Sequence, residues 1–114
     1  MNSAFEEISV SELAQRLAQQ DETVQLIDVR EPQELELAAL PEFVNLPLSQ
    51  HETWSQQIVP QLDPHAETVV MCHHGMRSAQ MCQWLVGQGF TQVKNVAGGI
   101  DAYSTRVDGT VPRY

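Results

Sequence analysis

The residues most able to do chemistry in this sequence form a short run that begins at a cysteine, Cys72–Ser78. The cysteine directly follows the apolar stretch 68–71, and Gly75 and Arg77 come within five positions of it. Thiolate is the reactive form of cysteine, and it is favoured by a nearby cation, a helix N-terminus and backbone N–H groups that turn inward. We therefore expect Cys72 to be a nucleophile; the alternative is a small apolar residue that finishes a core strand.

Two histidines, His73 and His74, follow the cysteine directly. One of them at the mouth of a pocket would be partly protonated near neutral pH, and it would attract an anionic donor or pass a proton to an acceptor. The alternative is that both are simply solvated. Consecutive side chains in a tight loop converge poorly on one metal ion, and the sequence has no Cys-x-x-Cys or His-x-x-x-His motif. We expect neither a metal nor a cofactor.

Alternating strand-like and helix-like patterns surround this run and must position it. Short apolar stretches at 24–29, 43–46, 68–71 and 92–96 are typical of buried parallel strands. Five helical patterns lie before, between and after these stretches. Capping boxes at Ser9 and Ser49 open two of the helices, and Pro32 suits the first turn of a third. The last two helices begin near Ser78 and Gly98. The helix that starts near Ser49 carries Trp54 and Ile58. This alternation predicts an α/β fold with a mainly parallel central sheet and helices on both faces.

The predicted sheet would place the chemistry at one edge. Cys72 would lie at the carboxyl end of a parallel strand, where ligands bind in open α/β sheets. Asp28 and Arg30 end a neighbouring strand at the same edge, and we expect them to support the loop. Arg77 would pair with a donor anion, with an acid that braces the loop, or with both. Cys82 lies on the apolar face of the following helix and is expected to be a buried core thiol.

Length and charge limit the classes of function. A chain of 114 residues suits one domain, so we expect a single domain over residues 1–114. The net charge of −9 argues against partners such as nucleic acid or an anionic membrane surface. The sequence shows neither an apolar run long enough to span a bilayer nor a signal peptide, and its two cysteines suit a reducing compartment. These features predict a cytoplasmic protein.

The run Cys72–Ser78 resembles the active-site loop of the rhodanese family, which comprises thiosulfate sulfurtransferases and their single-domain relatives. Three further segments are similar to family motifs and lie in the family's order: 26–31, with Asp-x-Arg-Glu, 44–47 and the Gly-Gly turn at 96–100. The resemblance implies a rhodanese-like fold and transfer of sulfane sulfur through a persulfide on the catalytic Cys72. The donor would be thiosulfate or a protein persulfide, and the acceptor a thiol carrier or cyanide. The loop residues implied to bind substrate and persulfide are His73, His74, Gly75, Met76, Arg77 and Ser78, with Asp28 and Arg30 in support.

Two other classes of function are weighed against sulfur transfer. Cysteine-based phosphatases and arsenate reductases use a similar loop, but the phosphatases place one more residue between cysteine and arginine than the four found here. The shorter loop would suit a single sulfur atom better than a phosphoryl group, and it holds no Asp to protonate a leaving alkoxide. A non-catalytic partner-binding module is the other class, and such modules commonly lack the cysteine. Sulfur transfer is therefore the expected function.

Overall fold

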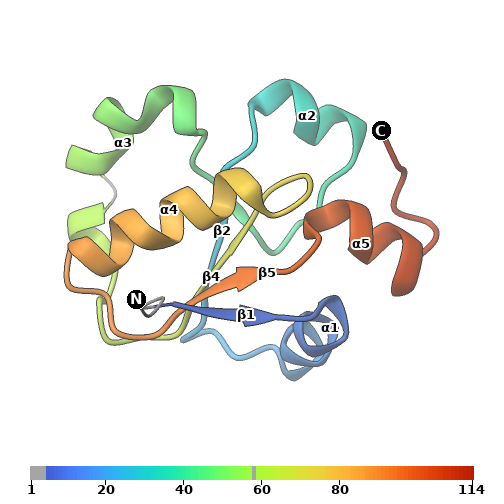
Figure 1. The fold of residues 1–114 in the computed structure, drawn as a ribbon, viewed down its shortest axis with the longest axis horizontal. Helices are drawn as coiled ribbons and strands as arrows, with labels where there is room; N and C mark the ends of the chain where they lie inside the picture. Colours follow the sequence, from blue (N-terminus) through green and yellow to red (C-terminus); the bar gives the residue numbers. More distant parts are fainter. Residues whose placement is uncertain (1–4, 58) are drawn as a thin grey trace.

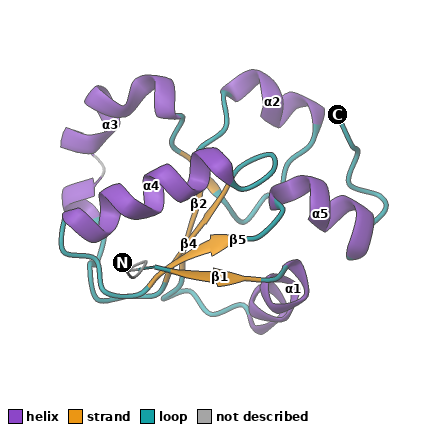
Figure 2. Ribbon diagram, viewed as in Figure 1, coloured by secondary structure: helices purple, strands orange, loops and turns teal. Residues whose placement is uncertain are grey.

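Strands and helices alternate along the chain (Figures 1 and 2). The structure is a computed structural model that describes residues 5–57 and 59–114. Short 3-10 turns precede and follow α3, at Leu48–Gln50 and Val59–Gln61. The elements are β1 (Glu6–Ile8), α1 (Val10–Gln19), β2 (Gln25–Asp28), α2 (Pro32–Leu37), β3 (Val44–Asn45), α3 (His51–Gln57), β4 (Thr68–Met71), α4 (Met76–Gly87), β5 (Val93–Val96) and α5 (Gly99–Arg106).

The strands form one parallel sheet in the order β1-β5-β4-β2-β3. β4 lies at its centre, paired with β2 through Ile27 and Val70 and with β5 through Val70 and Asn95. All four residues of β4 are buried, as expected for a strand covered on both faces. The carboxyl end of this central strand therefore leads directly into the cysteine run.

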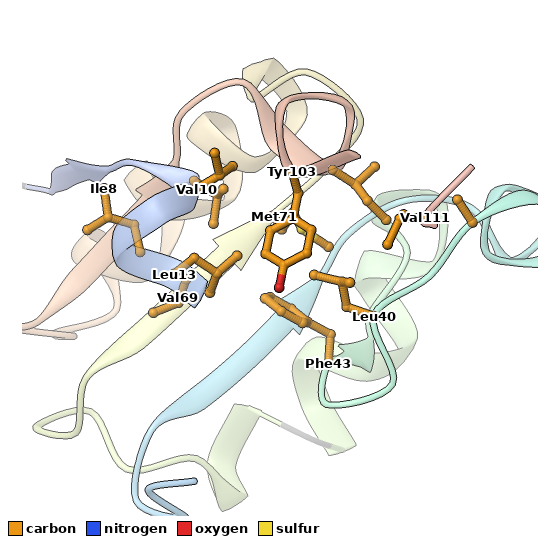
Figure 3. Close-up of a cluster of buried hydrophobic side chains, with 12 residues drawn as sticks. Ile8, Val10, Leu13, Leu40, Phe43, Val69, Met71, Tyr103 and Val111 are labelled. Carbon is orange, nitrogen blue, oxygen red and sulfur yellow. The ribbon is translucent and has the colours of Figure 1, made fainter. Parts of the chain in front are cut away.

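Helices cover both faces of the sheet, as the sequence predicts (Figure 1). On one face, the side chains of α1 and α5 join those of β1 and β4 in an apolar cluster, part of which is shown in Figure 3. On the other face, α3 and α4 pack over a second cluster that contains Trp54, Met81, Cys82 and Leu85. Because side chains alternate along a strand, Val69 and Met71 join the first cluster, and Val70 and Cys72 join the second. The Cys72 side chain thus lies on the α4 side of the sheet.

Three local features of the structure differ from what the sequence predicts. β1 lies at the sheet edge and was not predicted, because its three residues include two acidic ones. Ser49 does not cap α3; it lies in the preceding 3-10 turn, and its hydroxyl donates to Glu31 Oε1 at 2.5 Å. Helix α4 begins at Met76, two residues before the predicted start.

Other local predictions agree with it. Ser9 caps α1, accepting from Glu12 N–H at 3.1 Å, and the Glu12 carboxylate accepts from Ser9 N–H at 3.0 Å. Gly89, just after α4, takes a left-handed conformation with φ of +96°, whereas Gly87 is still helical. Ile58, which the sequence predicts in the same helix as Trp54, lies outside the described residues. Among the described residues, no helix combines the length and the apolar character that crossing a bilayer requires.

Candidate active site

Cys72 lies at the carboxyl end of β4, where the chain turns into α4. Its side chain is 1% exposed. Gly75 N–H donates to Cys72 Sγ at 3.0 Å, and the Ser78 hydroxyl lies 3.3 Å from the same sulfur. Backbone and hydroxyl donors at these distances stabilise negative charge on sulfur more than they stabilise a neutral thiol. The sequence predicts loop amides that face the sulfur, and the structure places the amide of Gly75 there.

Glycine is required where the loop turns into α4. Gly75 has φ of +108°, a left-handed conformation that side chains other than glycine rarely adopt. This conformation makes Gly75 the N-cap residue of α4 and points its N–H back at the Cys72 sulfur. The position of the donor therefore depends directly on the glycine.

The start of α5 holds the cysteine loop from the other side. Ile100 N–H donates to the carbonyl of Cys72 at 2.9 Å, and Asp101 N–H donates to that of His73 at 3.1 Å. A side chain at Gly99, where φ is +61°, would overlap both carbonyl oxygens. Two free amides of a helix N-terminus are thus used to fix the backbone of the loop.

Arg77 makes a bidentate ion pair with Glu34 of α2, with N–O distances of 2.6 and 2.9 Å. Hydrogen bonds from this guanidinium lower the pKa of Glu34 to about 2, and the carboxylate in turn raises the pKa of Arg77. Of the two roles considered for Arg77, the structure shows the bracing one, with Glu34 as the acid. Glu34 was not predicted as a site residue, because it lies 43 positions from its partner.

Asp28 and Arg30 form a second arginine–carboxylate pair, at the end of β2. Both are buried, and Arg30 Nη2 lies 2.7 Å from Asp28 Oδ2. The Asn45 amide fixes the backbone here, because its Nδ2 donates to the carbonyls of Asp28 and Arg30 at 2.9 and 2.8 Å. Arg30 also donates to the carbonyl of Glu34 and to the Tyr114 hydroxyl, so this pair is linked to Glu34 and not to the sulfur. The supporting role of Asp28 and Arg30 stays a prediction.

Tyr114 connects the two arginine–carboxylate pairs. Its hydroxyl accepts from Arg30 Nη1 at 2.9 Å and donates to Glu34 Oε1 at 2.8 Å. Burial raises the pKa of Tyr114, so the hydroxyl keeps the proton that it donates. The same ring stacks on His73, with centroids 3.9 Å apart and planes 4° from parallel. The sequence gives no local signal for this role, since the two hydrogen bonds span 84 and 80 positions.

The two histidines have different surroundings. His73 is partly buried between Tyr114 and His74, and this burial, with a smaller effect from His74, lowers the pKa of His73. His74 is 63% exposed, and its Nε2 lies 3.9 Å from Asp101 Oδ2. Both histidines and Asp101 offer metal-ligand atoms within 4.8 Å of one another, a grouping the sequence did not predict because Asp101 is distant in the chain. The Asp101 carboxylate is already paired with Arg113: Nε donates to Oδ1 at 2.9 Å, and Nη2 donates to Oδ2 at 3.3 Å.

A shallow groove of about 460 Å³ lies beside the loop. It is lined by Gly75, Met76, Ala79, Ala97 and Gly98, and by the polar residues Glu7, His74, Gln80 and Asn95. Met76 is 80% exposed, so this loop residue presents its thioether to solvent. A reactant that approached the loop from this side would meet a surface that is more apolar than polar, with Glu7 and His74 among its polar residues.

The other cysteine has a different environment. Cys82 is completely buried in the apolar cluster under α4. This burial raises the pKa of Cys82 to about 12, which keeps the side chain a neutral thiol. The prediction of a core thiol at this position is confirmed.

Comparison with known proteins places this geometry in a family. The family model for the rhodanese-like domain matches residues 9–106. A chloroplastic rhodanese-like/PpiC domain-containing protein of Arabidopsis thaliana is 51% identical over 90 residues, which cover 79% of this chain. The chain spans only 30% of the length of that relative.

Two further proteins match over most of their own length. A sulfurtransferase of Allochromatium vinosum is 35% identical over 102 residues, covering 86% of this chain and 87% of the relative. The crystal structure of a rhodanese-related protein from Thermoplasma volcanium is 26% identical, with a TM-score of 0.73, and the match covers 90% of this chain and 94% of that one. The match of the rhodanese-like domain model to residues 9–106, together with the 35% identity to a sulfurtransferase of similar length, shows that the chain belongs to the rhodanese family.

Proposed function

We propose that this protein transfers sulfane sulfur through a persulfide on Cys72. The observation that carries the proposal is the hydrogen bond from Gly75 N–H to Cys72 Sγ, 3.0 Å long, at the turn into α4. A donor held in this position stabilises the Cys72 thiolate before attack and again when transfer to the acceptor regenerates it. Membership of the rhodanese family and the similarity to a sulfurtransferase support the same reaction.

The first half-reaction loads the enzyme. The Cys72 thiolate attacks the outer sulfur of a donor, and a new S–S bond forms as the donor's own S–S bond breaks. With thiosulfate as donor, sulfite leaves with the electron pair of the broken bond. The product is a persulfide on Cys72, and no external oxidant is needed.

The second half-reaction passes the sulfur from Cys72 to an acceptor. An acceptor thiolate, or cyanide, attacks the outer sulfur of the persulfide and takes it away. The bond to Cys72 breaks, and its electron pair regenerates the Cys72 thiolate. Two successive transfers through one covalent intermediate give ping-pong kinetics.

The charge distribution favours a carrier over a small anion as the physiological donor. The molecule has a net charge of −9, which repels thiosulfate at long range. The guanidiniums of Arg30 and Arg77 are both paired with carboxylates. We therefore propose a protein persulfide or a thiol carrier as the partner in the cell, with thiosulfate serving in vitro.

The experiment that tests the proposal is intact mass spectrometry of the reduced protein after incubation with thiosulfate. We expect one added sulfur atom, located by fragmentation on the peptide that contains Cys72, and its loss after addition of cyanide. Incubation with an aryl phosphate tests the phosphatase alternative. Phosphate release without sulfur loading would overturn the proposal.

We also propose that residues 1–114 form one rhodanese-like domain. We place the protein in the reducing cytoplasm, where Cys72 and Cys82 would not be oxidised to disulfides.

A further inference from the structure

Asn95 of β5 lies behind the cysteine loop in a fixed orientation. It is 3% exposed. Its Nδ2 donates to the carbonyl of Gly75 at 3.0 Å and to Glu7 Oε2, also at 3.0 Å. Because both partners are acceptors, they identify the nitrogen of the amide. The oxygen, Oδ1, therefore faces Ser78.

Ser78 stands between Asn95 and the sulfur. Its hydroxyl oxygen lies 2.5 Å from Asn95 Oδ1 and 3.3 Å from Cys72 Sγ. The side chain is fully buried. A hydroxyl carries a single hydrogen, so it donates to only one of these two acceptors at a time.

The protonation state of Cys72 decides which acceptor suits Ser78. When Cys72 is a thiol, its S–H donates to Ser78 Oγ, and Ser78 donates to Asn95 at the shorter distance. When Cys72 is a thiolate, the hydroxyl stabilises it only by turning its hydrogen from Asn95 to the sulfur. That turn costs the bond to Asn95 Oδ1, whose donor among the described residues is Ser78.

From this competition we propose that Asn95 is a positioning residue that restrains Ser78 and so limits the thiolate form of Cys72. Asn95 acts through Ser78 and does not contact the sulfur donor. The inference rests on the proposed function, because it treats the thiolate as the attacking species. It assigns to β5 a part in setting the reactivity of a nucleophile that lies at the end of β4.

The test measures how fast Cys72 is alkylated by iodoacetamide at a fixed pH below neutrality, with peptide mapping to separate Cys72 from Cys82. Asn95→Leu removes the acceptor that competes for the Ser78 hydrogen. We expect alkylation to become about fivefold faster, the equivalent of one ordinary hydrogen bond. Asn95→Asp loses the same amide donor but keeps an acceptor for Ser78, and its added negative charge also disfavours a neighbouring thiolate, so it gives no acceleration.

A Ser78→Ala background isolates the coupling. In that background, Asn95→Leu should leave the alkylation rate unchanged or lower it, because there is no hydroxyl left to release. Equal acceleration with and without Ser78, or no acceleration with it, would overturn the inference. Asn95→Val tests the same point if the leucine variant does not fold, since valine suits a strand and also removes the acceptor.

Alkylation requires no sulfur donor, so this test is independent of the proposed reaction. A protein that takes up no sulfur but shows the expected pattern with iodoacetamide would refute the sulfur transfer and leave the role of Asn95 standing. Sulfur loading without the alkylation pattern would support sulfur transfer and refute the role of Asn95.

Discussion

At the scale of single residues, Gly75 N–H donates to the sulfur of Cys72, and the Ser78 hydroxyl lies 3.3 Å from it. Both residues also have hydrogen bonds to Asn95, which do not involve the sulfur. Replacement of Cys72 by serine keeps an acceptor for Gly75 N–H in a site of nearly the same shape. We expect Cys72→Ser to abolish sulfur loading and to leave the circular dichroism spectrum unchanged. An unfolded variant would instead indicate that Cys72 is needed for the core.

Cys82→Ser is the matched control, because it makes the same change in the other buried thiol. A hydroxyl placed in this apolar cluster should lower the free energy of unfolding by about 1 to 3 kcal/mol. Sulfur loading should remain, measured by the same mass spectrometry. Loss of loading in a folded protein would contradict a packing role for Cys82.

Glu34 links the stability of the protein to acid pH. Its pKa is lowered from 4.5 to about 2, chiefly by hydrogen bonds from Arg77. A carboxyl group with a depressed folded-state pKa contributes stability that is complete above its ordinary value and is lost as the pH falls to about 2. We expect Glu34→Gln to cost about 1 to 3 kcal/mol at neutral pH, measured by denaturant unfolding.

The pH profile separates this effect from a packing defect. The difference between Glu34→Gln and the parent protein should shrink as the pH falls from 4.5 to about 2. A difference that stays constant over this range would show that the charge of Glu34 contributes nothing.

The sequence indicates the nucleophile at residue scale, but not its supporting partners. Cys72, Gly75 and Arg77 are close in the chain, so their types and spacing already point to an anion-binding turn. Glu34 and Tyr114 come to the site from distant segments, and no local pattern distinguishes Glu34 from other acidic residues of the chain. Their contribution depends on how the elements pack.

At the scale of elements, the first turn of α5 fixes the backbone of the cysteine loop. Gly99→Ala would place a methyl group against the carbonyl oxygens of Cys72 and His73, at a residue with a left-handed φ. We expect the free energy of unfolding to fall by about 1 to 2 kcal/mol or more, because of backbone strain and overpacking. Sulfur loading should also become slower. Thermal unfolding and mass spectrometry measure the two effects.

Gly87→Ala provides the control for that substitution. Gly87 lies in the last turn of α4, and an added methyl group there meets nothing within 4 Å. Alanine is the better helix former, so this variant should be more stable by about 0.5 to 1 kcal/mol, with normal loading. If both glycine variants lost activity alike, the close approach at Gly99 would not be the cause.

The segment that follows α5 brings Tyr114 over the loop, and its stacking on His73 has a measurable signature. Removal of the ring by Tyr114→Ala should expose His73 and raise its pKa toward the ordinary value, because burial is the main cause of its lowering. Tyr114→Phe keeps the ring and should keep the pKa low. NMR titration of the His73 imidazole measures this pKa, and equal pKa values in the two variants would contradict the stacking role.

Long, strongly patterned elements are the ones that the sequence predicts. β2, β4, β5 and the helices around them follow from apolar runs, caps and glycines. β1 was missed because pairing with β5, and not its own composition, makes it a strand. The predicted cap of α3 was wrong for a related reason. The hydroxyl of Ser49 donates to the carboxylate of Glu31, which is distant in the chain, and does not bond to the backbone of the following helix.

At the scale of the whole molecule, the negative charge should oppose small anionic donors. The net charge of −9 repels thiosulfate, and dissolved salt screens that repulsion. We expect the rate of sulfur loading from thiosulfate to rise with ionic strength, whereas the rate with an uncharged donor should hardly change. A thiosulfate rate that fell with added salt would indicate local attraction strong enough to outweigh the overall field.

The attachment of the loop to α5 also offers a way to watch it indirectly. The amide hydrogens of Ile100 and Asp101 are bonded to the carbonyls of Cys72 and His73, so their exchange with deuterated water depends on whether that backbone stays in place. A neighbouring helix thereby reports on the loop while the sulfur is left unmodified. The resting state and the persulfide-loaded state could be compared in this way, with no label on the atom that reacts.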